Sequence, residues 1–132
     1  MHSPGSFKRL LVKENGEYVK DDFRHEHFLV INDGNKKILM SGCAHNGILS
    51  ILDAYKEKYD SYPDVVISGF HLMKKTEYTD DELREVLDIG RKLTKYPTLF
   101  YTCHCTGQRQ YGVMKKYMDS LNYISAGDTI VV

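Results

Sequence analysis

Residues 37–47 of the chain read KILMSGCAHNG, an apolar run that gives way to a polar turn containing glycine and one histidine. The same arrangement recurs at residues 65–72, which read VVISGFHL, and at residues 99–107, which read LFYTCHCTG. The apolar runs are short and contain β-branched and aromatic residues, a composition typical of buried strands. We therefore predict three interior strands, each followed directly by a turn that carries a histidine.

Helical patterns separate these three stretches. Apolar residues at helical spacing predict a helix from Asn46 to Tyr59, and Thr79–Glu82 matches a capping box, which marks the start of another. A third helix is predicted over Tyr111 to Leu121. After it, a turn at Gly127–Asp128 is expected to lead into a last strand, Thr129 to Val132.

The segment before the first of these helices has the pattern of strands alone. Strands are predicted at Phe7 to Val12 and at Phe28 to Ile31, and the turn sequence Asp33–Asn35 joins the second to Lys37–Ser41 as a hairpin. Beyond this hairpin helices and strands alternate, which predicts βαβ units and a largely parallel sheet. The expected fold class is α/β, a mixed sheet with about three helices, in a single domain over residues 1–132.

The three turns carry His45, His71 and His104. In a parallel sheet the carboxyl ends of neighbouring strands lie at one edge, where reactive groups gather, so we expect the three imidazoles to converge there. Neutral imidazole binds zinc and other borderline divalent metals. The alternative is that each histidine is only a hydrogen-bonded turn residue.

Two further clusters have competing interpretations. Cys103 and Cys105 flank His104, and a thiol there would be reactive if the imidazole and a helix N-terminus activated it, although no third group stands out to orient such a base. On an extended strand these two thiols would share the face opposite His104. The triplet His25–His27 would place two imidazoles on one face of a strand, but the apolar residues after it favour the polar start of a buried strand.

Composition narrows the classes of partner. Lys and Arg number 18, Asp and Glu number 18, and the formal net charge is zero. This balance argues against binding to nucleic acid through an excess of positive charge, and it gives no polybasic surface for binding a membrane. No apolar run approaches the ~18 residues that a membrane span needs. The number of cysteines, three, is odd, which argues against a disulfide framework and predicts a location in the reducing cytoplasm.

Taken together, the three turns resemble the C-terminal half of a metallo-β-lactamase-fold hydrolase. The group they resemble most is the metal-dependent hydrolases related to dihydropterin–ribofuranosylaminobenzene-phosphate synthase, whose turns read Gly-Cys-Ser-His-Gly, Gly-Gly-Phe-His-Leu and His-Cys-Thr-Gly. The corresponding residues here are 42–47, 68–72 and 104–107, and Asp22–His27 is similar to that group's segment before its hairpin. The resemblance runs in order along essentially the whole chain.

The resemblance implies an αββα sandwich of two similar halves, of which this chain is the C-terminal one. The defining His-x-His-x-Asp-His metal motif of that fold lies in the other half and is absent from this sequence. His25–His27 does not supply it, because Leu29 and Val30 stand where the Asp and the last His would be.

The resemblance also assigns roles to the three strand-end histidines. It implies that His45 and His104 are metal ligands. His71 would lie at the same pocket as a catalytic or substrate-contacting group or, ranked lower, as a further ligand. Cys43, close to where related enzymes have a metal-bridging aspartate, is a lower-ranked candidate.

The function expected from the resemblance is that of a portion of a metal-dependent hydrolase. Zinc or another divalent metal would activate water for attack on an ester, amide or phosphoester of a small-molecule substrate. The isolated chain is expected to be inactive, and its uncovered sheet face to be filled by the missing N-terminal half or by a second copy in a homodimer. Two alternatives stay open: a non-catalytic dimeric binding module that keeps the fold, and a small dimeric metalloenzyme.

Overall fold

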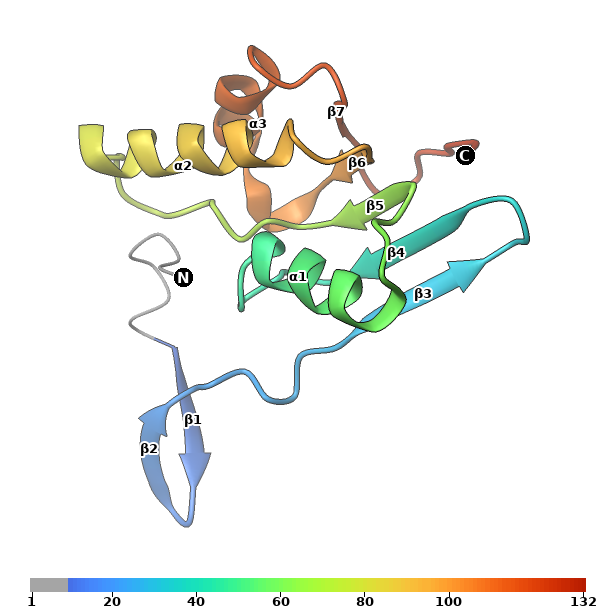
Figure 1. Ribbon diagram of the computed structural model, residues 1–132. Helices are drawn as coiled ribbons and strands as arrows, with labels where there is room; N and C mark the ends of the chain where they lie inside the picture. Colours follow the sequence, from blue (N-terminus) through green and yellow to red (C-terminus); the bar gives the residue numbers. More distant parts are fainter. Residues whose placement is uncertain (1–9) are drawn as a thin grey trace.

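The structure, a computed structural model, describes residues 10–132 of the chain (Figure 1). A two-stranded hairpin comes first, and a five-stranded sheet with three helices follows. In chain order the elements are β1 (Leu11–Glu14), β2 (Glu17–Lys20), β3 (Phe28–Asn32), β4 (Lys37–Ser41), α1 (Ile48–Tyr59), β5 (Val65–Ser68), α2 (Asp80–Leu93), β6 (Leu99–Thr102), α3 (Gln108–Lys115) and β7 (Leu121–Tyr123).

The larger sheet has the strand order β3-β4-β5-β6-β7. β3 and β4 form an antiparallel hairpin, in which Phe28 pairs with Ser41, and the pairs from β4 to β7 are all parallel. The expected α/β class, with a mixed and largely parallel sheet, is confirmed. None of the helices in residues 10–132 is long and apolar enough to cross a membrane.

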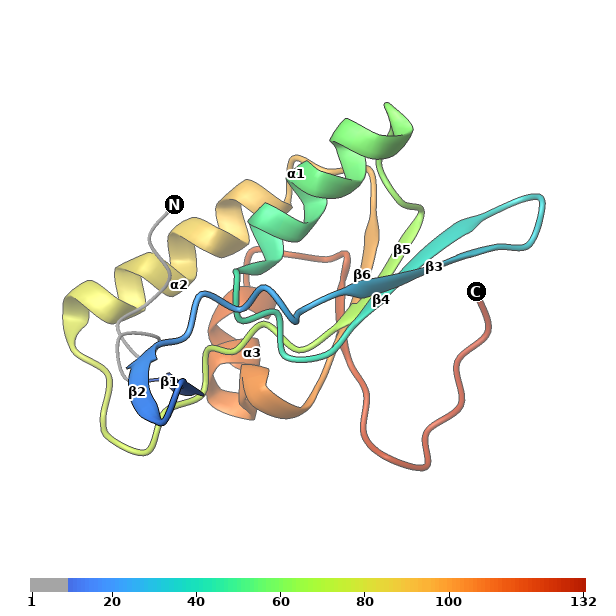
Figure 2. The same cartoon turned by 90° about the horizontal axis from the view of Figure 1, so that it is seen from below.

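One face of this sheet forms the hydrophobic core. Leu39 of β4, Val66 of β5 and Phe100 of β6 are aligned by the strand pairing and have no exposed surface. α1 and α2 lie on the same side of the sheet (Figure 2) and add Leu52 and Val86 to the same buried cluster. Burial of each such side chain stabilises the fold by roughly 1.5–3 kcal/mol, so this layer holds in place the strands whose ends carry the histidine turns.

The helix starts follow local sequence signals. The hydroxyl of Thr79 accepts a hydrogen bond from the backbone N–H of Glu82, and the Glu82 carboxylate accepts one from the backbone N–H of Thr79. This reciprocal pair is the predicted capping box, and it satisfies amide groups that the first turn of α2 would leave unpaired. α1 begins at Ile48 rather than at Asn46.

The C-terminal elements differ from the expectation. α3 ends at Lys115, so the apolar residues beyond it belong to other elements: Met118 packs in the core and Leu121 begins β7. The predicted last strand, Thr129 to Val132, is wrong, because β7 takes the place beside β6 and residues 129–132 form no strand. β7 has only three residues, too few to interrupt the helical spacing of the apolar residues before it.

The N-terminal prediction is also revised. The predicted strand Phe7 to Val12 lies partly outside the described residues. Within them, β1 covers Leu11–Glu14 and pairs with β2, a strand that the sequence pattern did not indicate.

The second face of the five-stranded sheet is apolar and partly open. Because successive residues of a strand point to opposite faces, the neighbours of the core residues lie on this side. Strand pairing aligns Leu29, Met40, Ile67 and Tyr101 in one row across β3 to β6. Leu29 is 58% exposed and Met40 is 38% exposed. Apolar surface gathered in this way is typical of a protein interface.

We expect this face to drive self-association of the chain. In sedimentation velocity at increasing protein concentration, the wild type should form dimers or larger species, and the double variant Leu29→Lys/Met40→Lys should shift toward monomer. Leu11→Lys is a matched control, because Leu11 is 57% exposed but lies in β1, outside this sheet. A wild-type chain that stays monomeric at high concentration contradicts the prediction.

Candidate metal centre

The turns after β4, β5 and β6 are tied to one another by backbone hydrogen bonds. The N–H of Gly69 donates to the carbonyl of Gly42 at 2.9 Å, which joins the first turn to the second. The N–H groups of Leu72 and Met73 both donate to the carbonyl of Cys105, at 3.0 and 2.8 Å, which joins the second turn to the third. The carboxyl ends of the three strands therefore form one continuous site.

The structure brings the three expected histidines to this site. The rings of His45 and His71 meet edge to face, with centroids 4.5 Å apart. His104 is more exposed, and its Nδ1 lies 3.7 Å from the Sγ of Cys43. Burial lowers the pKa of His71; electrostatic interactions with His45 and His104 lower this pKa further, and the interaction with Glu26 raises it. His71 is therefore uncharged at neutral pH.

Two thiols lie beside these histidines. The potential ligand atoms of Cys43, His71 and Cys105, which together we call the thiol cluster, lie within 4.8 Å of one another. Zinc–sulfur and zinc–nitrogen bonds of about 2.3 and 2.0 Å separate tetrahedral ligands by roughly 3.5 Å, so small side-chain rotations would bring these atoms onto one ion. The donor set fits a zinc-type metal. Burial, and next a hydrogen bond with Cys43, raises the pKa of Cys105 to about 12, so a metal bound there would displace its proton.

Three residues in these turns adopt a backbone conformation that is rare for residues other than glycine. Ala44, His71 and His104 have φ values of 54°, 50° and 50°. Non-glycine residues in this left-handed region cost of order 1–3 kcal/mol each and persist where surrounding contacts hold them. Here the hydroxyl of Thr106 accepts a hydrogen bond from the N–H of Phe70 at 2.8 Å and fixes the second turn against the third.

The reactive-thiol alternative finds no support in this geometry. β6 ends at Thr102 and residues His104–Thr106 form a short 3₁₀ turn, so Cys103 and Cys105 do not share a strand face as expected. Burial raises the pKa of both thiols, which opposes formation of a nucleophilic thiolate.

The histidines before β3 lie outside the cluster. His25 and His27 are exposed; His25 lies 3.9 Å from the carboxylate of Asp21, and the His27 ring contacts the carbonyl of His25. Between them, Glu26 is turned inward and contacts the turn that carries His45. Glu26 did not stand out as a site residue in the sequence, because its partner is 19 residues away along the chain. Cys105 was expected there only as a reactive thiol, and its contact with the carbonyl of Cys43 spans 62 residues.

The sequence of this chain is similar to parts of two longer proteins. No protein-family model matches the chain. It is 30% identical over 94 residues to an uncharacterized protein of Methanocaldococcus jannaschii, covering 71% of this chain and 32% of that protein. It is 29% identical over 120 residues to the 7,8-dihydropterin-6-methyl-4-(beta-D-ribofuranosyl)-aminobenzene-5'-phosphate synthase of the same organism, covering 89% of this chain and 39% of the synthase.

A solved structure matches the fold as well as the sequence. It is a metal-dependent hydrolase of the β-lactamase superfamily, with 30% sequence identity and a TM-score of 0.71 over 92% of this chain. The match covers 46% of that hydrolase, so the chain spans less than half the length of each of these relatives. The resemblance that its three histidine turns indicate is confirmed: in sequence and in fold, this chain matches part of a metal-dependent hydrolase of the β-lactamase superfamily.

Proposed function

We propose that this chain supplies one side of the metal centre of a metal-dependent hydrolase, as the C-terminal half of the fold. The observation that carries the proposal is a chain of contacts at one edge of the sheet. His45 meets His71, His71 lies within 4.8 Å of the thiols of Cys43 and Cys105, and His104 lies 3.7 Å from Cys43. The likeness to a metal-dependent hydrolase supports the same reaction class. Zinc or another divalent ion bound here would activate water and polarise an ester, amide or phosphoester of a small-molecule substrate.

We assign a role to each histidine from its surroundings. His45 and His104 would bind the metal as neutral imidazoles. His71, whose pKa is lowered by burial, stays uncharged at neutral pH and would accept a proton or a hydrogen bond from the substrate. The other half of the fold would supply the remaining ligands, through the His-x-His-x-Asp-His motif. We therefore expect the isolated chain to be inactive.

A second ligand set is favoured by the thiol cluster. Cys43, His71 and Cys105 offer two soft sulfur donors and one nitrogen, which suit zinc better than magnesium or calcium. In this arrangement His71 would be a ligand rather than a substrate contact. The three cysteines are free, a state that fits the reducing cytoplasm we propose for the protein.

Metal content tests the proposal directly. Protein purified without a chelator or an affinity tag is analysed for metal per chain, then titrated with Co²⁺ while its absorption spectrum is recorded. We expect weak binding with visible bands from imidazole ligands; a strong near-ultraviolet sulfur-to-cobalt band would instead identify the thiol set. Tight stoichiometric metal in a dimer would favour the small metalloenzyme, and no binding at all would favour the non-catalytic module.

A further inference from the structure

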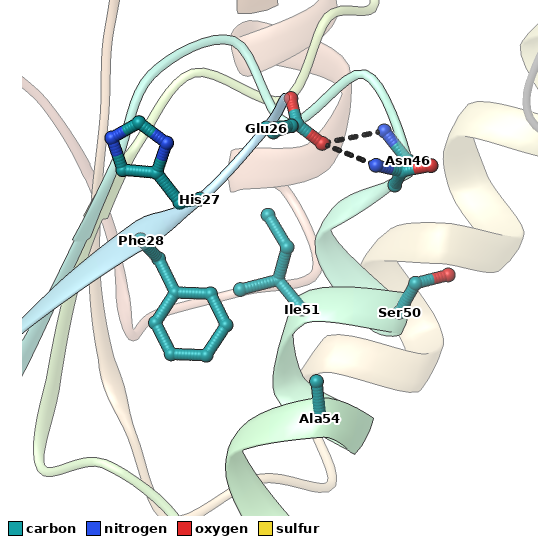
Figure 3. A pocket seen from close by; sticks show the side chains of 7 residues that line it. All are labelled: Glu26, His27, Phe28, Asn46, Ser50, Ile51 and Ala54. Carbon is teal, nitrogen blue, oxygen red and sulfur yellow. Dashed lines mark hydrogen bonds between the residues drawn. The ribbon is translucent and has the colours of Figure 1, made fainter. Parts of the chain in front are cut away.

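The carboxylate of Glu26 joins the segment before β3 to the turn after β4. Its Oε1 accepts a hydrogen bond from the backbone N–H of His45 at 2.5 Å. Its Oε2 accepts two from Asn46, one from the backbone N–H and one from the side-chain amide, each at 2.9 Å (Figure 3). With a side chain only 11% exposed, Glu26 is an inward-facing acid at the border of the candidate metal centre.

The same carboxylate lies beside the imidazole of His45. Glu26 Oε1 is 3.6 Å from His45 Nδ1, slightly beyond hydrogen-bond range, and a small ring rotation would close the distance. Phe23 packs on the His45 ring with centroids 5.0 Å apart, and the ring of His71 meets it edge to face. Three neighbours therefore fix where the His45 ring lies.

Glu26, and not its histidine neighbours, reaches the site. In Figure 3 the ring of His27 lies on the opposite side of the backbone from the bonds that Glu26 makes to Asn46. His25 is exposed, with a side chain 66% accessible. In the triplet His25–His27, the glutamate is the member that contacts the candidate centre.

We propose that Glu26 is a positioning residue for His45, an inference that rests on the proposed metal-binding role of that histidine. A carboxylate beside Nδ1 favours the tautomer with the proton on Nδ1, which leaves the lone pair on Nε2 for a metal. The two backbone N–H bonds hold the turn, so the carboxylate sets both the position and the tautomer of the ring. Loss of such a partner typically lowers metal affinity by 10–100-fold.

The test compares Glu26→Gln with Asn46→Ala. The first variant keeps the size of the side chain but removes the negative charge beside Nδ1. The second removes the Asn46 side-chain bonds to Glu26 and to the carbonyl of Phe23, and leaves the carboxylate beside His45 in place. Asn46→Ala is therefore a control for mere loosening of the turn.

The first readout is the tautomer of His45 in metal-free protein at pH 8, from the nitrogen chemical shifts of its ring. We expect the Nδ1–H form in the wild type and in Asn46→Ala, and a shift toward the Nε2–H form in Glu26→Gln. The second readout is the affinity for Co²⁺, which should fall by roughly 10–100-fold in Glu26→Gln and by much less in the control.

An unchanged His45 tautomer in Glu26→Gln, with affinity no lower than in Asn46→Ala, would reduce Glu26 to a structural tie and overturn the inference. If the wild type binds no metal, the proposed function fails while the tautomer still decides the role of Glu26. Should Glu26→Gln fail to fold, Glu26→Asp withdraws the carboxylate by one methylene; a wild-type tautomer in that variant would also overturn the inference.

Discussion

The affinity for metal is expected to fall by about 100-fold or more when His104 is replaced by alanine. Loss of a direct ligand should lower the affinity at least as much as loss of a residue that hydrogen-bonds to a ligand. His104 begins the 3₁₀ turn after β6, its Nδ1 lies 3.7 Å from the Sγ of Cys43, and the residue is exposed. Isothermal titration with Zn²⁺ or Co²⁺ measures the change.

The matched control is His25→Ala. His25 is also an exposed histidine of this chain, yet its partner is the carboxylate of Asp21 rather than any member of the thiol cluster. We expect the affinity of this variant to equal that of the wild type. Equal titrations for His104→Ala and His25→Ala would refute the assignment of His104 as a ligand.

Replacing Gly69 by alanine is expected to lower the free energy of unfolding by roughly 1–3 kcal/mol, the usual cost of forcing extra atoms into a packed site. An added Cβ would lie 2.5 Å from the Sγ of Cys105 and 3.3 Å from the carbonyl oxygen of Gly42. At Gly69 the second turn therefore lies close to both the first turn and the third. Urea denaturation monitored by circular dichroism gives the difference.

Gly42→Ala is the control for this variant. A Cβ at Gly42 would meet no atom within 4 Å, so its free energy of unfolding should stay close to that of the wild type. The double variant Gly69→Ala/Cys105→Ala removes the sulfur that the new methyl group meets, and should recover part of the lost stability. Equal destabilisation by Gly69→Ala and Gly42→Ala would show that close packing at Gly69 is not the cause.

The parts of the fold that local chemistry determines could be predicted from the sequence. The capping box at Thr79–Glu82 and the β-branched run of the strand Val65–Ser68 are local signals, and both elements form where they were expected. The edge of the sheet at which His45, His71 and His104 meet followed from the alternation of strands and helices. β7 was missed because its three residues continue an apolar spacing that also suits a helix.

The composition of the site was harder to predict, because it depends on contacts between distant segments. Cys105 reaches the carbonyl of Cys43 across 62 residues, and the 3₁₀ turn that points it there cannot be read from the spacing of Cys103 and Cys105. Glu26 meets His45 across 19 residues, through a turn whose path is set only once β3 and β4 have paired. The sequence singled out the histidines and, at a lower rank, Cys43. It indicated Cys105 only as a reactive thiol and did not indicate Glu26.

The left-handed backbone at His71 and His104 has a consequence for engineering this scaffold. A residue that adopts positive φ more readily, such as glycine or asparagine, would relieve strain at both positions. A search for thermostable variants that ignores chemistry would therefore favour replacing two of the histidines that we propose for the metal centre. In this fold the optimum for heat resistance and the optimum for metal chemistry lie at different sequences.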